Sequence, residues 1–362
     1  MGEPHGIGIV GLGVISAQYL QLLSGHPAVR IAATADLDVA RAAAVADGIE
    51  GCRALTVDEL VADPAVQTVL NLTIPAAHAE VAHAALRAGK NVFGEKPLAP
   101  TVDAARGIVE AAGSAWVGCA PDTALGTGVQ TARAVVDAGE IGRPISAVAT
   151  WVSPGHEAWH PNPDFYYHEG GGPLLDMGPY YLTALFHLLG PVARVSGASA
   201  RPHATRRIAT GPRAGEDIPV EVDTHVTGIL EHVDGAISTV TFSFDGAATG
   251  AAPIEVHGET GTLSLPDPNM FDGDLRLRRP GDQEWTQIPA RAGYQEAGRG
   301  IGLLDSLRPD GRRTDASVAL HVLEIMTSLL DSARTGQRIE LTTTAGRPSL
   351  VPLTTREQWS LQ

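Results

Sequence analysis

Short apolar runs alternate with amphipathic stretches over the first 122 residues of the chain. Runs of Val, Ile and Ala that are typical of buried strands lie at residues 7–10, 29–35, 66–73, 90–95 and 115–119. The stretches between them, such as AAHAEVAHAALRAG, repeat their apolar residues at helical spacing. This alternation of strands and helices predicts a parallel, doubly wound sheet.

After residue 122 the pattern changes to alternating, β-branched segments. Between residues 192 and 288 these segments favour an antiparallel sheet with one covered face. Further predicted elements are helices at 125–138, 174–190 and 317–333 and a strand at 145–152, which is followed by a polar, proline-rich loop.

The length of the chain, 362 residues, favours more than one domain. We therefore predict an α/β protein with a doubly wound domain at residues 1–122. An α+β domain with a large, mostly antiparallel open sheet is predicted at residues 123–362.

The composition limits the partners that we expect. The formal net charge is −15, whereas proteins that bind nucleic acid or anionic membranes present a basic surface. Cys52 and Cys119 are the only cysteines, too few for a disulfide scaffold. No apolar run is long enough to span a bilayer, and the N-terminus lacks the pattern of a leader peptide. We expect a cytoplasmic protein with no nucleic-acid or membrane partner.

Two overlapping glycine patterns lie near the N-terminus. GIGIVG (residues 6–11) fits G-x-G-x-x-G, but too few residues precede it for a strand. GLGVIS (residues 11–16) departs at the third glycine, yet it follows IGIV and opens a helix. In that setting, backbone N–H groups and the helix dipole meet a pyrophosphate. The cofactor contacts predicted from this turn are Gly11, Leu12, Gly13, Val14 and Ile15.

Asp36 completes the sequence pattern of a dinucleotide site. It ends the second predicted strand, where a carboxylate can accept hydrogen bonds from both hydroxyls of the adenosine ribose. The same charge repels a 2′-phosphate, so the sequence favours NAD over NADP. The alternative is that Asp36 only caps the helix that follows.

The segment HEAWH (residues 156–160) matches the zinc-protease motif H-E-x-x-H. That motif works on a helix, where both histidines share one face and the glutamate serves as general base. Prolines at 154, 161 and 163 oppose a helix here. We therefore predict no metal site and assign the segment to a loop.

Residues 94–100 read GEKPLAP and place Lys96 at the carboxyl end of a parallel strand, where ligands bind in open α/β folds. Taken alone, such a lysine is more often a solvated surface residue. Two longer stretches, TIPAAHAEVAHAALRAGKNVFGEKPLA and EGGGPLLDMGPYYLTALFHLLG, change this interpretation when they are read together with GIVGLGVIS.

In these three stretches the chain resembles the Gfo/Idh/MocA oxidoreductases (glucose–fructose oxidoreductase, inositol dehydrogenase and their relatives). The resemblance implies a Rossmann fold for the first domain and a lysine, Lys96, that touches both nicotinamide and substrate. Pro97 is expected to fix the approach of that lysine. Further cofactor contacts are expected from three residues of the same stretches, namely Thr73, His78 and Glu95.

The resemblance also singles out Asp176 and Tyr180. Many relatives carry histidine four residues after this aspartate, whereas Tyr180 resembles the branches in which a tyrosine is the acid/base. Tyrosine at its ordinary pKa of about 10 is a poor base, and a lysine ammonium stabilises its anion. Lys96 and Tyr180 are the predicted acid/base pair and Asp176 orients the substrate; alternatively, Lys96 moves the proton and Tyr180 orients.

A structural interpretation of Asp176 and Tyr180 stays open. Pro179 indicates a helix that starts late, because proline is tolerated in the first turn. Asp176 is then only the N-cap of that helix, and Tyr180 a packed core ring.

The loop SPGHEAWHPNPDFYYHEGGG mixes aromatic rings with hydrogen-bonding groups, as sugar binding requires. The predicted substrate contacts are Lys96, His156, Trp159, His160, Phe165, Asp176 and Tyr180. The alternative is a surface loop whose Trp and Phe are tucked into the core. No Arg or Lys lies between Trp151 and Arg194, so an unphosphorylated sugar, polyol or glycoside is favoured. His187 and His321 are expected to be core histidines.

The leading hypothesis is an NAD-dependent dehydrogenase or reductase that acts on a secondary hydroxyl, or the matching ketone, of such a carbohydrate. One alternative is a redox-neutral glycoside hydrolase or lyase that uses tightly bound NAD for transient oxidation. Another is a non-catalytic dinucleotide-binding sensor, and a metalloenzyme comes last. The resemblance further implies that the open sheet pairs with another subunit in a homodimer or homotetramer.

Overall fold

The computed structural model describes residues 3–361, which fall into two compact units. The first runs to Gly126 and includes Ala292–Leu320 and the residues from Val351 onward; the second comprises Thr127–Arg291 and His321–Leu350. The predicted domain limits, 1–122 and 123–362, stay predictions.

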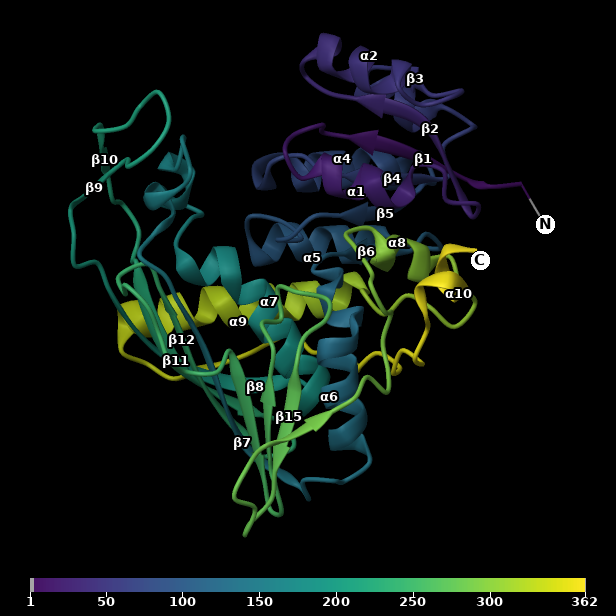
Figure 1. Cartoon of the computed structure of the whole chain (residues 1–362). Coiled ribbons are helices and arrows are strands. Elements are labelled where there is room, and N and C mark those ends of the chain that lie inside the picture. Colours follow the sequence, from purple (N-terminus) through teal and green to yellow (C-terminus); the bar gives the residue numbers. More distant parts are fainter. Residues whose placement is uncertain (1–2, 362) are drawn as a thin grey trace. The chain divides into compact units, whose positions relative to one another are not determined.

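The first unit contains a six-stranded sheet in the order β3-β2-β1-β4-β5-β6, and all its strand pairs are parallel. This is the strand order of a Rossmann fold and confirms the predicted doubly wound sheet. Its strands are β1 (His5–Val10), β2 (Val29–Ala35), β3 (Arg53–Ala54), β4 (Thr68–Asn71), β5 (Asn91–Gly94) and β6 (Val117–Cys119). Its helices are α1 (Ser16–Leu23), α2 (Val39–Asp47), α3 (Val57–Ala62), α4 (Pro75–Arg87), α5 (Val102–Ala111), α8 (Ile301–Ser306), α10 (Arg356–Ser360) and the 3₁₀ turn η1 (Asp122–Leu125) (Figure 1).

Two late segments of the chain belong to this unit through specific contacts. The buried carboxylate of Asp122 accepts hydrogen bonds from the backbone N–H groups of Gly300 (2.7 Å) and Gly302 (3.1 Å). Near the C-terminus, Trp359 stacks on His26 with ring centroids 6.5 Å apart. These contacts join segments that are far apart in the sequence, which periodicity along the chain does not reveal.

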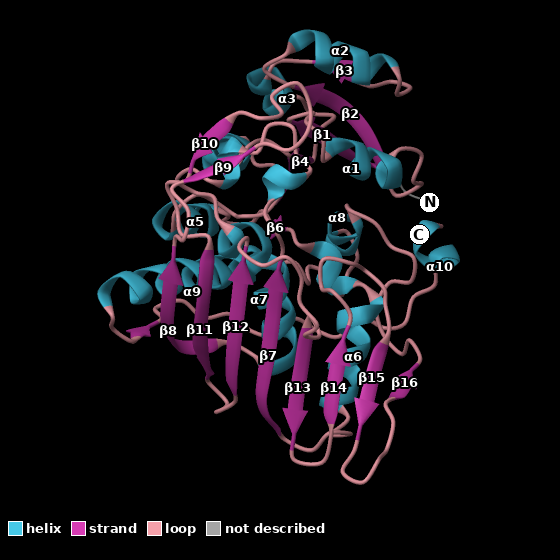
Figure 2. Cartoon of the chain, turned by 60° about the vertical axis from the view of Figure 1, so that its left-hand side comes forward, coloured by secondary structure: helices cyan, strands magenta, loops and turns pink. Residues whose placement is uncertain are grey.

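The second unit contains a nine-stranded sheet in the order β16-β15-β14-β13-β7-β12-β11-β8-β17 (Figure 2). Its pairs are antiparallel except for β7 with β12, so the predicted mostly antiparallel sheet is confirmed. The strands are β7 (Pro144–Val152), β8 (Val192–Ala200), β11 (His225–His232), β12 (Ile237–Ser243), β13 (Ile254–Gly258), β14 (Thr262–Leu265), β15 (Leu275–Arg278), β16 (Thr286–Ile288) and β17 (Ile339–Glu340). A separate hairpin joins β9 (Thr205–Arg207) to β10 (Asp217–Pro219).

Helices cover one face of this sheet. Helix α6 (Thr127–Asp137) packs against β14 and β15, and α7 (Pro173–Leu189) packs against β7, β11 and β12. The third helix, α9 (Ala316–Thr335), is long and apolar enough to cross a membrane, but 67% of that stretch is buried inside the fold, as in the core helix of a globular protein. Apolar residues on the other face, among them Val148, Ile229 and Ile237, are exposed. The sheet is therefore open on that face.

Helix α7 starts earlier than its internal proline indicates. It begins at Pro173 after Gly172, and the N–H of Asp176 already donates to the carbonyl of Gly172 at 3.1 Å. Pro179 lies inside the helix and is buried. The prediction of a late start with Asp176 as N-cap is wrong, because packing of a nearly fully buried helix offsets the backbone hydrogen bond that Pro179 removes.

The approach of α9 to the sheet yields a test of this packing. A Cβ built on Gly197 of β8 would lie 2.2 Å from the carbonyl oxygen of Leu329 on α9. Since the neighbour is backbone, Gly197→Ala must displace the helix, and we expect a loss of about 1–3 kcal/mol in the free energy of unfolding. Urea titration measures it. The control Gly250→Ala, where a Cβ meets nothing within 4 Å, should leave the midpoint unchanged; equal effects would contradict the packing.

Candidate active site

The turn after β1 has the geometry that the second glycine pattern predicts. Strand β1 ends at Val10 and α1 begins at Ser16. Gly11 has φ +89°, and a Cβ there would lie 2.7 Å from the backbone of Leu72 and Thr73. Only glycine fits such a position. At Gly13 a Cβ would meet nothing within 4 Å, so the turn is open beside it.

Gly6 and Gly8 serve a different purpose. Both lie within β1, and a Cβ at either position would collide with neighbours: the carbonyl oxygen of Ala65 at 1.9 Å, or the side chain of Leu60 at 2.6 Å. They allow close packing around the strand. The second glycine pattern follows the end of the strand, whereas the first lies almost entirely within it; that the second pattern contacts a cofactor stays a prediction.

The carboxylate of Asp36 is hydrogen-bonded to this turn. It directly follows β2, its Oδ2 accepts from Leu12 N at 2.7 Å, and its Oδ1 accepts from Asp38 N at 2.8 Å. Burial by itself raises the pKa of Asp36, but these two hydrogen bonds and the Arg41 guanidinium, 3.3 Å away, bring that pKa below its ordinary value. The N-cap of α2 is Asp38, so the capping alternative for Asp36 is wrong. An ionised carboxylate faces the glycine turn.

The other predicted cofactor residues of the first unit follow β4 and β5. One ring nitrogen of His78 lies 2.6 Å from the carbonyl oxygen of Pro97 and the other 3.0 Å from that of Thr73. His78 is buried and ties the two strand ends together. The peptide bond between Lys96 and Pro97 is cis.

Glu95 is a buried anchor for the neighbouring lysine. Its Oε1 accepts from the hydroxyl of Tyr19 at 2.8 Å, and its Oε2 accepts from the backbone N–H of Lys96 at 3.0 Å. Both carboxylate oxygens thus have partners inside the first unit. Glu95 holds the backbone of Lys96 in place, a role that its position in the sequence did not reveal.

In the second unit, helix α7 carries Asp176 and Tyr180 one turn apart, so they lie on one face. Asp176 Oδ2 lies 2.8 Å from Nε2 of His156, which belongs to the preceding loop. Tyr180 is 7% exposed. The structure therefore brings His156 and Asp176 together, although the sequence placed them in different motifs.

Aromatic rings form the outer part of the same loop. Trp159 is 59% and Phe165 57% exposed, and the ring of His160 lies between them at centroid distances of 5.3 and 5.5 Å. The alternative in which these rings are tucked into the core is wrong. The exposed rings of Trp159 and Phe165 and the half-buried ring of His160 between them form an aromatic row.

The glutamate of the HEAWH segment is part of the interior. Residues 156–158 form a single 3₁₀ turn, η2 (His156–Ala158), and Glu157 accepts a hydrogen bond from the hydroxyl of Tyr167. Arg206 also binds Glu157, with Nη1 2.9 Å from Oε1. Within residues 3–361, no three His, Cys, Asp or Glu side chains converge as a metal site requires. Glu157 is a structural residue that anchors the loop.

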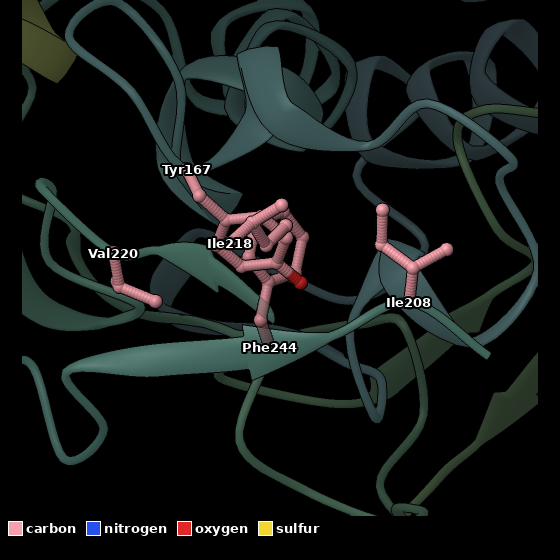
Figure 3. Close-up of a cluster of buried hydrophobic side chains, with 5 residues drawn as sticks. All are labelled: Tyr167, Ile208, Ile218, Val220 and Phe244. Carbon is pink, nitrogen blue, oxygen red and sulfur yellow. The ribbon is translucent and has the colours of Figure 1, made fainter. Parts of the chain in front are cut away.

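The hairpin β9–β10 holds this loop from a distance in sequence. Arg206 bridges Glu157 and Asp245, and Arg213 pairs with Asp164 at 2.6 Å. A cluster of buried side chains, drawn in Figure 3, includes Tyr167 of the loop and Ile218 of the hairpin. It is made of Tyr167, Ile208, Ile218, Val220 and Phe244. Both arginines lie beyond Arg194, outside the stretch in which the sequence shows no cation. Both are bound by carboxylates.

The two expected core histidines are buried as predicted: His187 is 1% and His321 0% exposed. Burial lowers the pKa of His187 to about 3, and it also lowers that of His321. Both rings are neutral structural side chains of the second unit.

Family models match both halves of the chain. The description "Oxidoreductase family, NAD-binding Rossmann fold" covers residues 5–121, and "GFO/IDH/MocA C-terminal domain" covers residues 129–264. The chain belongs to the Gfo/Idh/MocA oxidoreductase family. The resemblance in its motifs is thereby confirmed.

Similar proteins in this family include several named enzymes. Inositol 2-dehydrogenase 3 of Saccharopolyspora erythraea is 29% identical, over 72% of this chain and 73% of that protein. The 1,5-anhydro-D-fructose reductase of Ensifer adhaerens is 32% identical, over 58% of this chain and 59% of that protein. Less than two thirds of the latter is thus matched.

Solved structures of oxidoreductases share the fold. Levoglucosan dehydrogenase in complex with NADH and L-sorbose superposes with a TM-score of 0.76 at 20% identity, over 94% of this chain and 100% of that chain. An oxidoreductase from Agrobacterium radiobacter in complex with NAD⁺, L-tartaric acid and magnesium gives 0.75 at 21% identity, over 93% and 98%. At these identities the similarity establishes the fold.

The family's cofactor, NAD, fits the residues of the first unit. Gly11 and Gly13 leave the backbone of the turn accessible to a pyrophosphate, and the ionised Asp36 suits ribose hydroxyls. Exposed apolar side chains, Val14, Leu37 and Ile74, follow β1, β2 and β4 and provide apolar surface for flat rings. NAD supplies the hydride acceptor when it is bound.

Substitution of Asp36 tests the assignment of this residue to NAD binding. Asp36→Asn removes the charge, so we expect NAD to bind about 10- to 100-fold more weakly and the preference over NADP to shrink. Calorimetric titration with each nucleotide measures both effects. Because the pKa of Asp36 is lowered, the gap between wild type and variant should stay constant down to about pH 5 and close only at more acidic pH.

The control is Asp47→Asn, which changes an exposed carboxylate at the end of α2, the helix that follows Asp36. It should leave NAD affinity unchanged. If Asp36→Asn binds NAD as wild type does, the assignment of Asp36 to the ribose is wrong.

Proposed function

We propose that this protein is an NAD-dependent dehydrogenase or reductase of an unphosphorylated sugar, polyol or glycoside. It oxidises a secondary hydroxyl, or reduces the matching ketone. The observation that carries the proposal is the aromatic row of Trp159, His160 and Phe165. Within this row, Trp159 is hydrogen-bonded to His156, and His156 is hydrogen-bonded to Asp176 on α7. Aromatic faces beside fixed polar groups suit a ligand with apolar C–H faces and many hydroxyls.

The names of relatives support this class of substrate. Matches to the chain include inositol 2-dehydrogenases, a D-xylose dehydrogenase of Paenarthrobacter nicotinovorans (26% identical) and 1,5-anhydro-D-fructose reductase. These three names describe polyhydroxylated rings or chains without a phosphate, whereas a further relative, 30% identical, is named for a dTDP-linked sugar.

Charge at the loop also supports an uncharged substrate. The two arginines that reach the loop are neutralised: Arg206 by Glu157 and Asp245, and Arg213 by Asp164 and Glu216. A phosphate group would have to displace a carboxylate from one of these pairs. Hydroxyl groups face no such competition.

The proposed chemistry divides between two side chains. Alcohol oxidation requires removal of the hydroxyl proton as hydride leaves the carbon, and Lys96 with Tyr180 forms the acid/base pair for that proton. The lysine ammonium stabilises a tyrosinate, and Asp176 orients the reacting hydroxyl. Glu95 and His156 hold the backbone of Lys96 and the carboxylate of Asp176 respectively.

A substrate screen tests the function. Wild-type protein, NAD and a panel of unphosphorylated sugars, polyols and glycosides should give absorbance of reduced nicotinamide with at least one compound. The matched sugar phosphates should react more slowly. Turnover of a carbohydrate without net reduced cofactor would replace the proposal by the redox-neutral alternative, and binding of NAD without any turnover would favour the sensor.

The acid/base pair predicts strong coupling between two substitutions. We expect Lys96→Met and Tyr180→Phe each to lower kcat by about 100-fold or more, with NAD affinity retained. The double variant should be hardly slower than the worse single variant, because groups that act as a unit are not additive. Steady-state kinetics measures this; purely additive losses would mean independent roles and would contradict the pair.

Phe165 tests the aromatic row. Phe165→Ala removes an exposed ring that contacts Tyr166 and His160, and we expect KM for the sugar to rise about 3- to 10-fold with little change in kcat. The control Trp285→Ala removes a partly exposed ring elsewhere in the second unit and should change neither constant. An unchanged KM in Phe165→Ala would remove Phe165 from the binding surface.

The oligomeric state stays a prediction. The exposed Val148, Ile229 and Ile237 on the open face of the nine-stranded sheet support a homodimer or homotetramer that covers this face.

A further inference from the structure

Both ring nitrogens of His156 have partners, and the partners differ in kind. Nδ1 lies 3.2 Å from the indole Nε1 of Trp159, which can only donate a hydrogen bond. Nδ1 must therefore accept, and the hydrogen of the neutral ring resides on Nε2. Nε2 lies 2.8 Å from Asp176 Oδ2, which as a carboxylate oxygen accepts. The two neighbours select one tautomer of His156.

The ring of His156 is also held on its sides. It is 6% exposed and packs at centroid distances of 4.2 Å against Tyr166, 4.8 Å against Phe244 and 5.9 Å against Trp151. Tyr166 belongs to η3 (Asp164–Tyr166), Phe244 directly follows β12, and Trp151 lies in β7. A ring enclosed in this way keeps its orientation.

The backbone of the loop beside the ring is fixed as well. The next residue, Glu157, is bound by Arg206 and Tyr167, and its carbonyl oxygen accepts from Ala209 N at 2.9 Å. His160 N donates to the carbonyl oxygen of His156 at 2.8 Å. The hairpin thus anchors the segment that carries His156.

We infer that His156 is a positioning residue for Asp176 and that its two hydrogen-bond partners, Trp159 and Asp176, together select its working tautomer. The inference rests on the proposed function, in which Asp176 orients the reacting hydroxyl. The residue one turn after Asp176 on α7 is Tyr180, which has no imidazole. The imidazole that binds Asp176 belongs to His156 of the loop. The N–H of His156 fixes one oxygen of the carboxylate and thereby its plane.

The arrangement also connects substrate recognition to Asp176. Trp159 is an exposed ring of the aromatic row and at the same time the donor to His156, which in turn donates to Asp176. A sugar ring that packs on Trp159 holds the indole in the orientation that this chain of hydrogen bonds requires. Substitutions at Trp159 should therefore change kcat, whereas Phe165→Ala changes mainly KM.

The tautomer can be measured without any substrate. In nitrogen NMR spectra of protein labelled with ¹⁵N-histidine, the signal that disappears in His156→Gln belongs to His156. We expect it to show a neutral ring with hydrogen on Nε2. In Trp159→Phe, which keeps a ring but removes the donor, the Nδ1 signal should shift, whereas the hydrogen should stay on Nε2 because Asp176 still accepts it. A ring protonated on Nδ1 in the wild type overturns the inference.

Kinetics of three variants tests the positioning role. The amide nitrogen of His156→Gln reaches the place of Nε2 and can still donate to Asp176, whereas His156→Asn reaches only the place of Nδ1. With the first compound among inositol, D-xylose and L-sorbose that gives turnover with NAD, His156→Asn and His156→Phe should lower kcat about 10- to 100-fold, with a smaller change in KM. His156→Gln should restore most of the loss.

Two further variants separate the possible failures. His168→Gln changes another histidine of the same loop, which pairs with Glu221, and should leave kcat unchanged. Asp176→Asn tests the proposed function itself. If Asp176→Asn is as active as wild type, the proposed role of Asp176 fails; if Asp176→Asn is impaired while His156→Asn is fully active, only the inference about His156 fails.

Discussion

The buried carboxylate of Glu157 is the contact on which the loop of the second unit depends. This carboxylate pairs with Arg206 of the hairpin and accepts a hydrogen bond from the hydroxyl of Tyr167. Arg206 also binds Asp245. Removing one partner from a buried ion pair leaves an uncompensated charge and costs about 3–5 kcal/mol. This network fixes the 3₁₀ turn that carries His156, and through His156 it reaches Asp176 on α7. A segment without regular structure thereby obtains a defined shape.

In the proposed function, the two units recognise their ligands by different means. The first unit offers mainly backbone groups, in a turn that needs glycine at position 11 and at strand ends held together by His78. It adds one carboxylate, Asp36. The second presents side chains, most of them aromatic, on a loop anchored by ion pairs. Since the loop residues do not take part in the nucleotide turn, substrate preference can change within such a family while cofactor binding stays the same.

Much of this architecture can be predicted from the sequence because it follows local rules. Apolar runs at the right spacing predict the six-stranded sheet except for β3, whose two exposed residues, Arg53 and Ala54, carry no apolar pattern. The strand before Gly11 decides between the two glycine patterns. The buried length of α7 overrides Pro179, so a local rule about proline gave the wrong start for that helix.

The contacts of the loop could not be predicted in this way. Arg206 lies 49 residues after Glu157, and nothing in the periodicity between them indicates that they meet. The pairing of His156 with Asp176 joins a loop without periodicity to a helix 20 residues later. The roles of the HEAWH residues could not be predicted from the motif either. Its glutamate anchors the loop, and its first histidine is hydrogen-bonded to an aspartate.

The most direct test of the account is the origin of the hydrogen in the reduced cofactor. Carbohydrates deuterated at all their carbons would be turned over with NAD in ordinary water, and the reduced nicotinamide examined by mass spectrometry. If the protein is a dehydrogenase, the reduced cofactor carries deuterium from a carbon of the substrate. Product formed while the cofactor remains unlabelled and oxidised would contradict a dehydrogenase and identify a reaction without net oxidation.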